Sequence, residues 1–204
     1  MSIILTSNGL SSENIVDVFK QLSVSGLNKA AIVVTADPVY RQNNWIAVSI
    51  KEKFEEIGFA TDFFDIEFSQ PNRLLEFDVI FLIGGNPYYL LNQIRRTHTD
   101  DILRELLINE KVISGSSAGC IVLGQTIALI NEFDPQMNVE VGLTDFSGLG
   151  LTSVNLCPHY SRYKDRYENF EERIIRVEAN KNITITRIND GDAIIVDGEK
   201  LVKI

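Results

Sequence analysis

Short, continuously apolar segments that alternate with amphipathic ones constrain the fold of this chain most. Strands buried on both faces lose the two-residue alternation of half-exposed strands, so this pattern predicts a parallel sheet covered by helices on both sides. The sequence predicts an α/β three-layer sandwich with a mostly parallel central sheet, of the flavodoxin-like kind. The expected strands are residues 2–7, 29–36, 60–66, 78–85 and 111–115, with helices at 11–26, at 43–59 and, one or two, within 87–109.

The rest of the chain continues with fewer and shorter elements. A strand is expected at 152–159, a helix at 166–180, and strands with an Asp-Gly hairpin turn at 197–198 near the end. No internal repeat, low-complexity tract or linker interrupts the 204 residues. We therefore predict a single catalytic domain over 1–204, long enough to bury a core without disulfides.

Charge and composition exclude several classes of partner. The net charge of -9 repels phosphate backbones and anionic lipid, so neither nucleic acid nor a membrane is an expected partner. The N-terminus has no basic region, and no apolar run approaches the ~20 residues that span a bilayer. Cys120 and Cys157 form no C-x-x-C pair, which favours reduced thiols and a cytoplasmic protein.

The segment "GSSAG" lies where the strand at 111–115 meets the next helix. In a G-x-S-x-G elbow the central serine is lifted above the sheet, and bulky neighbours would clash with the backbone. Ser117 is central here, between Gly115 and Gly119, and is the candidate nucleophile. The N–H of Ala118 could then stabilise an oxyanion, together with that of Gly85 if the glycine loop after residues 78–83 lies beside the elbow. The alternative is an ordinary tight turn.

A serine nucleophile needs a base, and the chain has only two histidines. His98 lies in a polar connection between helices. His159 follows the strand ending "NLCP", so its ring should emerge at the carboxyl edge of the sheet, where active sites of α/β proteins lie. His159 is the candidate base. The orienting carboxylate is sought between elbow and histidine, where Glu132 and Asp134 both remain possible.

These motifs together resemble the dipeptidase E (alpha-aspartyl dipeptidase) family of serine peptidases. The likeness includes "IILTSNG", "IGGN", "GSSAG" and "CPH" and spans most of the chain. It implies the class I glutamine amidotransferase-like fold and a cofactor-free, metal-free hydrolase acting on short peptides, as a monomer or homodimer. By resemblance, Ser117 is the nucleophile, His159 the base, and Gly85 with Ala118 the oxyanion hole.

Two positions depart from the family pattern. The family has an aspartate fifteen residues after the serine, where this chain has Glu132, which we therefore favour over Asp134 as the third triad member. Phe170 falls where an arginine is implicated in recognising an N-terminal aspartate, so strict aspartyl specificity is not expected. The candidate substrate-binding residues are Asn86, Arg162, Lys164 and Arg166.

The predicted function is a serine peptidase that hydrolyses short peptides through a Ser-His-Glu triad and an acyl-enzyme. The alternatives are another amide or ester hydrolase, or a non-catalytic binding or regulatory protein on the same fold. Cys120 lies beyond the elbow and is expected to be a core thiol, and Cys157 with His159 supplies too few ligands for zinc.

Overall fold

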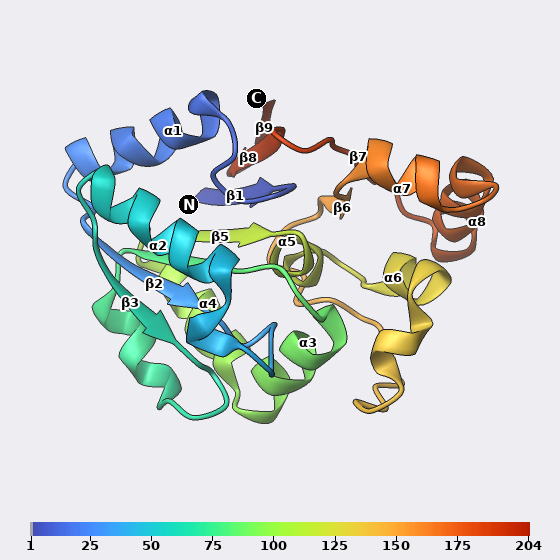
Figure 1. Cartoon of the computed structure of the whole chain (residues 1–204), viewed down its shortest axis with the longest axis horizontal. Coiled ribbons are helices and arrows are strands. Elements are labelled where there is room, and N and C mark those ends of the chain that lie inside the picture. The colour runs from blue at the N-terminus through green and yellow to red at the C-terminus, as the bar shows by residue number, and fades with distance from the viewer. Residues whose placement is uncertain (1) are drawn as a thin grey trace.

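A seven-stranded, mostly parallel sheet forms the centre of the computed structural model, which describes residues 2–204 (Figure 1). Its strand order is β3-β2-β4-β5-β1-β8-β9. The strands are β1 (Ser2–Thr6), β2 (Lys29–Val33), β3 (Ala60–Phe64), β4 (Val79–Leu82), β5 (Val112–Ser116), β8 (Ala193–Asp197) and β9 (Lys200–Lys203). The first five are parallel to one another, which confirms the predicted fold class.

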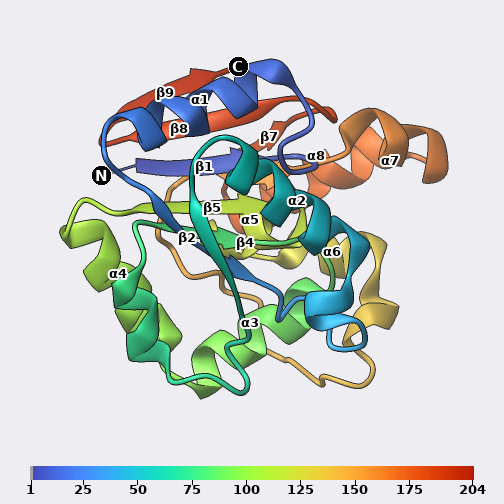
Figure 2. The same cartoon turned by 60° about the vertical axis from the view of Figure 1, so that its left-hand side comes forward.

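Neighbouring residues of β4 show how helices cover both faces of the sheet. Phe81 packs against Phe19 of α1 (Glu13–Val24) and Phe54 of α2 (Trp45–Glu56). The next residue, Leu82, points to the opposite face, where it meets Gly119 of α5 (Ala118–Leu123). Two further helices, α3 (Pro87–Arg96) and α4 (Thr99–Ile108), lie on that side with α5, and Figure 2 shows the layers from another direction.

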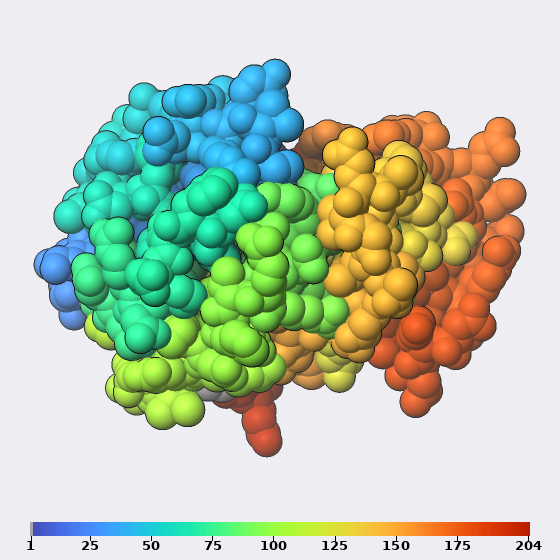
Figure 3. All heavy atoms as spheres, turned by 90° about the horizontal axis from the view of Figure 1, so that it is seen from below, coloured from blue at the N-terminus to red at the C-terminus, as the bar shows by residue number. Residues whose placement is uncertain are grey.

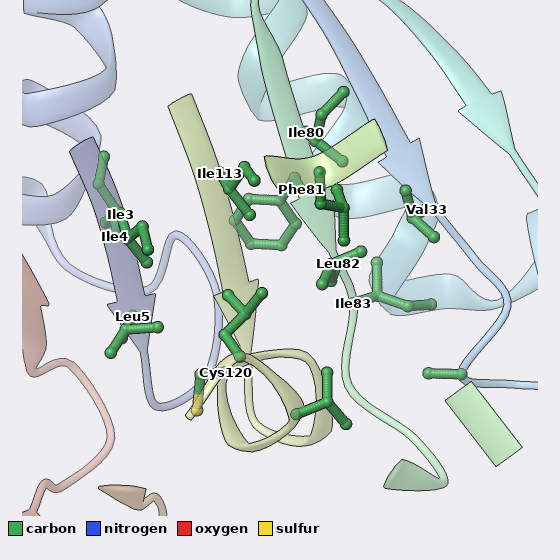
Figure 4. Close-up of a cluster of buried hydrophobic side chains, with 14 of the residues drawn as sticks. Ile3, Ile4, Leu5, Val33, Ile80, Phe81, Leu82, Ile83, Ile113 and Cys120 are labelled. Atoms are coloured by element: carbon green, nitrogen blue, oxygen red, sulfur yellow. The ribbon is translucent and has the colours of Figure 1, made fainter. Parts of the chain in front are cut away.

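The buried strands make a continuous apolar core between the helices. Figure 4 shows aliphatic side chains of β1, β2, β4 and β5 around Phe81, and all of those labelled are at most 2% exposed. Cys120 lies at the edge of this cluster, and burial raises the pKa of its thiol. Cys120 therefore belongs to the core.

Side-chain caps explain where two of the helices begin. Asn44 accepts hydrogen bonds from the amides of Ile46 and Ala47 at the start of α2. Asn86 does the same for the amides of Tyr88 and Tyr89 at the start of α3, and Pro87 occupies the first helical position. These caps fix the loops that precede both helices, and both loops border the site described below.

The sheet ends in an antiparallel hairpin, as predicted. Strand β8 pairs with β1, and β9 pairs with β8 through the turn that follows Asp197. The turn residues are Gly198 and Glu199, one position later than predicted, because Asp197 still pairs with Lys200, and Gly198 has a φ of 60°. Because β8 runs opposite to β1, the segment before β8 reaches the carboxyl edge of β1.

The remaining elements form a smaller unit beside the sheet, at the right of Figure 1. The predicted strand at 152–159 is reduced to β6 (Asn155–Cys157), which pairs with β7 (Ile185–Arg187) in a separate two-stranded sheet. The predicted helix at 166–180 corresponds to α8 (Phe170–Lys181), and a further helix, α7 (Tyr160–Arg166), precedes it. Together with α6 (Ala128–Phe133), α8 encloses a second apolar cluster.

A long segment after α6 runs over the outside of the molecule, and its gold surface lies beside the orange α7–α8 region in Figure 3. Arg95 of α3 donates hydrogen bonds to the carbonyls of Asp145 and Ser147 in this segment. Along residues 2–204, no helix has the length and apolar character needed to cross a membrane.

Candidate active site

Ser117 lies at a sharp corner between β5 and α5. Its backbone has φ 50° and ψ -112°, outside the regions that a non-glycine residue ordinarily adopts. A Cβ on Gly115 would lie 2.4 Å from the carbonyl carbon of Gly119, and a Cβ on Gly119 would lie 2.2 Å from the carbonyl oxygen of Leu82. Both glycines are thus needed for close backbone packing, and together they hold the serine in a strained conformation of the kind found at functional sites.

His159 faces this serine directly. Its Nε2 lies 2.9 Å from the Ser117 Oγ, and the residue is 8% exposed. The backbone of His159 is left-handed, with φ 54°, at the start of α7. The Tyr163 ring packs edge-on against the imidazole at 5.6 Å between centroids. The αL turn and the tyrosine together fix the direction of the ring.

A carboxylate completes the arrangement on the other side of the imidazole. The Asp190 Oδ1 lies 2.5 Å from the His159 Nδ1. Asp190 belongs to the connection between β7 and β8, which reaches the carboxyl edge of β1. The Ser7 hydroxyl, just beyond β1, donates to the same oxygen at 2.9 Å and accepts the His159 amide at 2.8 Å. Ser7 therefore ties the aspartate and the histidine to the central strand.

The predicted third member, Glu132, is not at this position. It lies on α6 and pairs with Arg173 of α8, whose Nε is 2.9 Å from its Oε1. The alternative, Asp134, is buried and accepts the Tyr167 hydroxyl at 2.7 Å. The Ser-His-Glu arrangement is therefore corrected: Glu132 pairs with Arg173 and Asp134 with Tyr167, and the imidazole contacts Asp190.

The environment keeps the imidazole neutral and the aspartate ionised. Burial lowers the pKa of His159, and this exceeds the opposing effect of Asp190. Burial raises the pKa of Asp190, but hydrogen bonds from His159, Ser7 and Arg162 bring it below its ordinary value. A neutral imidazole whose Nδ1–H bonds to a carboxylate leaves Nε2 free to accept a proton from Ser117.

The glycine loop after β4 borders the space in front of the serine. Gly84 and Gly85 follow β4, and a Cβ on Gly84 would lie 3.2 Å from the Ser117 Cβ, so the glycine loop does lie beside the elbow. Gly85 has φ 148°, and its Cβ would lie 2.4 Å from the Ala36 carbonyl oxygen. Within residues 2–204, the amides of Gly85 and Ala118 donate no hydrogen bond. Both amides therefore have a free donor.

The four predicted substrate-binding residues differ in their surroundings. Asn86 uses its side chain to cap α3 and to donate to the Met137 carbonyl, so its polar atoms already have partners. Arg162 is 3.1 Å from the Asp190 Oδ2 and lines the hollow in front of Ser117. Lys164 is exposed and lies outside that hollow, and Arg166 pairs with Asp134 at 3.7 Å. Arg162 is the one of the four beside the histidine.

The hollow has a volume of about 490 Å³. Ser117, His159, Gly84 and Gly85 line its inner end, and residues of α2 and of the loop after β1 line the rest. This volume falls within the range of pockets that hold small molecules.

The fold and this corner together define a class of α/β proteins in which a strained serine at a strand-to-helix turn faces a histidine. The sequence profile of peptidase family S51 matches residues 3–204, so the chain belongs to that family and is a peptidase. This confirms the resemblance noted in the sequence.

Individual relatives agree over almost the whole chain. An uncharacterized peptidase of Listeria monocytogenes is 24% identical over 98% of this chain and 97% of its own length. A Drosophila melanogaster protein named probable alpha-aspartyl dipeptidase is 25% identical over 91% of this chain and 75% of its own. The crystal structure of a candidate peptidase E from Listeria monocytogenes EGD-e superimposes with a TM-score of 0.78, at 25% identity over 100% of this chain and 97% of that one.

Sequence reasoning missed two residues of the site, Ser7 and Asp190. The search for a carboxylate covered only the segment between the serine and the histidine, whereas Asp190 comes after both. A signal was present in "RINDGDAII", where Asp190 lies in a turn between two predicted strands. Ser7 carried no comparable signal, since its role depends on where β1 ends.

Proposed function

We propose that this protein is a serine peptidase that hydrolyses short peptides through a Ser117-His159-Asp190 triad and an acyl-enzyme. The observation that carries the proposal is the continuous chain of contacts from the Ser117 Oγ to the His159 Nε2 at 2.9 Å and from the Nδ1 to Asp190 at 2.5 Å. Membership of peptidase family S51 supports a peptide as the substrate.

In the first half of the reaction, the Ser117 Oγ attacks the peptide carbonyl carbon while the His159 Nε2 takes its proton. The carbonyl oxygen becomes an oxyanion, for which the amides of Gly85 and Ala118 are the proposed donors. The C–N bond then breaks, the leaving amine takes the proton from Nε2, and the acyl group stays on Ser117 as an ester.

In the second half, water enters in place of the amine. His159 takes a proton from the water as its oxygen attacks the ester, and returns that proton to the Ser117 Oγ when the C–O bond breaks. Asp190 stays ionised throughout and stabilises the imidazolium that forms twice in each turnover. The cycle consumes one water and needs no cofactor.

The proposal does not include strict aspartyl specificity. Phe170, at the position implicated in aspartate recognition, is 3% exposed and packs against Phe133 in the second apolar cluster. Arg162, which lies beside the imidazole and lines the hollow, is the proposed substrate-binding cation. Reduced, buried Cys120 and Cys157 support a cytoplasmic enzyme.

The test is Ser117→Ala, assayed with a panel of dipeptides that vary the first residue and with simple esters. We expect hydrolysis of every cleaved substrate to fall by several orders of magnitude, because triad members act as a unit. A fluorophosphonate probe should label the wild type at Ser117 and leave the variant unlabelled. Full activity in Ser117→Ala would refute the mechanism, and an unlabelled, inactive wild type would favour a binding protein.

A further inference from the structure

The hollow in front of Ser117 continues well beyond the reacting groups. It extends along the first turns of α2, where Trp45, Ile46, Ile50 and Lys53 line it together with Leu10. Its inner end includes His159 and Arg162, so it lies on the side from which a leaving amine would take its proton. The same hollow therefore has room for a substrate residue on the leaving side of the scissile bond to extend toward α2.

The charges of this hollow favour an anion. No aspartate or glutamate is among its lining residues, although the whole chain has a net charge of -9. Of its two cations, Arg162 is already paired with Asp190. Lys53 donates to the Leu10 carbonyl at 2.7 Å and, within residues 2–204, forms no ion pair, although Glu13 and Asp17 line a neighbouring hollow that it shares. A half-buried ammonium group without a carboxylate partner is stabilised by an incoming anion.

Next to this cation the wall is apolar and open to solvent. Trp45 is 76% exposed and Ile46 is 36% exposed, whereas the side chain of Ile50 is buried beneath them. A Cβ on Gly9 would be 3.4 Å from the Ile50 Cδ1 and 3.9 Å from the Ser116 Oγ, so the α2 wall begins close to the elbow. Exposed large side chains that line a pocket are typical of ligand contacts.

We propose that this α2 wall binds the C-terminal residue of the substrate, with Lys53 holding its carboxylate and Trp45 and Ile46 packing against an apolar side chain. The preferred substrates are then dipeptides with a free C-terminus and a large aliphatic or aromatic second residue. This inference rests on the proposed function for the direction of the peptide. Lys53 and Trp45 are specificity-determining residues in it and take no part in the bond-breaking steps.

Binding can be measured without hydrolysis, because Trp45 is the only tryptophan of the chain. In Ser117→Ala, titration with Ala-Leu should change the tryptophan fluorescence and saturate. Ala-Leu amide, or Ala-Leu added to Ser117→Ala/Lys53→Met, should bind roughly 10- to 100-fold more weakly, as expected for loss of a charge-assisted hydrogen bond. Ser117→Ala/Lys20→Met is the matched control, because it removes an exposed cation of α1 and should bind Ala-Leu unchanged.

Kinetics with an otherwise intact site give an independent readout. Lys53→Met should raise KM for Ala-Leu by about tenfold or more with little change in kcat, and Trp45→Ala should lower kcat/KM for Ala-Leu more than for Ala-Gly. Equal affinity of Lys53→Met and the control for Ala-Leu, or equal binding of the acid and its amide, would overturn the inference. A preference for Ala-Asp over Ala-Leu that Lys53→Met abolishes would also overturn it, since Lys53 would then read a side chain. These results differ from failure of the proposed function, which Ser117→Ala reports by keeping its activity.

Discussion

Replacing Asp190 by asparagine tests which carboxylate is the third member of the triad. The candidates are Asp190, which lies beside His159, and Glu132 on α6, which was expected from the sequence. The aspartate accepts from the His159 Nδ1–H and the Ser7 hydroxyl through one oxygen and from Arg162 through the other. An amide has one acceptor oxygen and one NH₂ group. If the NH₂ faces Nδ1, the proton of the neutral ring moves to Nε2, which then cannot accept the serine proton. If the oxygen faces Nδ1, the NH₂ faces the Arg162 cation.

The loss should therefore be large and fall on the chemical step. We expect Asp190→Asn to lower kcat by about 10³–10⁴, or roughly 4–5 kcal/mol of barrier, as for the carboxylate of other serine triads. Glu132→Gln is the matched control, because it also replaces one carboxylate by its amide. It breaks the half-exposed pair with Arg173, costs about 1 kcal/mol of stability at most, and should leave kcat within about threefold.

Steady-state hydrolysis of a cleaved dipeptide gives kcat, and thermal unfolding of both variants shows that they are folded. A drop of a hundredfold or more in Glu132→Gln, with Asp190→Asn near wild type, would refute the assignment. It would mean that α6 moves to the histidine when substrate binds.

Three further predictions test the same site. Activity requires neutral His159, and burial lowers its pKa, so kcat/KM should fall on the acid side with a midpoint below the ordinary histidine value of 6.5; a midpoint above it in the pH profile would contradict this. Ser7→Ala removes a bond to Asp190 and should lower kcat about tenfold with KM unchanged, whereas a rise in KM alone would argue against a positioning role. Gly119→Ala sets a methyl group against the Leu82 carbonyl and should destabilise the fold by about 3 kcal/mol or more, read as a lower unfolding midpoint in urea; an unchanged midpoint would show that the corner can relax.

Four of the five parallel strands, β1, β2, β4 and β5, were predictable because they are buried on both faces and carry a local signal, the continuous apolar run. The edge strand β3 is only partly buried. The serine corner was predictable for a related reason. At Gly115 and Gly119 there is no room for a side chain, because backbone atoms a few residues away or on the adjacent strand lie too close. The sequence therefore keeps glycine at both positions, and their fixed spacing can be recognised. Helix α7 was not predicted, since its exposed residues carry little apolar periodicity.

The position of the third side chain depends on contacts that no local pattern encodes. Glu132 and Asp134 lie closer than Asp190 to the serine in sequence, but Glu132 on α6 pairs with Arg173 of α8, and Asp134, which follows α6, accepts the Tyr167 hydroxyl. Counting residues from the nucleophile therefore cannot rank the carboxylates. Which carboxylate reaches the histidine depends on the edge of the sheet at which its segment lies.

The direction of β8 determines that edge for Asp190. In a parallel sheet the loops that follow strands gather at the carboxyl edge, and this rule identifies the loops after β1, β4 and β5 that carry Ser7, Gly85 and Ser117. Strand β8 is antiparallel to β1, so at this edge it begins rather than ends. The residues before β8 thus join those that follow the parallel strands. The Asp-Gly hairpin at the end of the chain required β8 and β9 to be antiparallel to each other, but it left open which of them would pair with β1. Pairing β8 with β1 is the step that places the Asp190 turn beside His159.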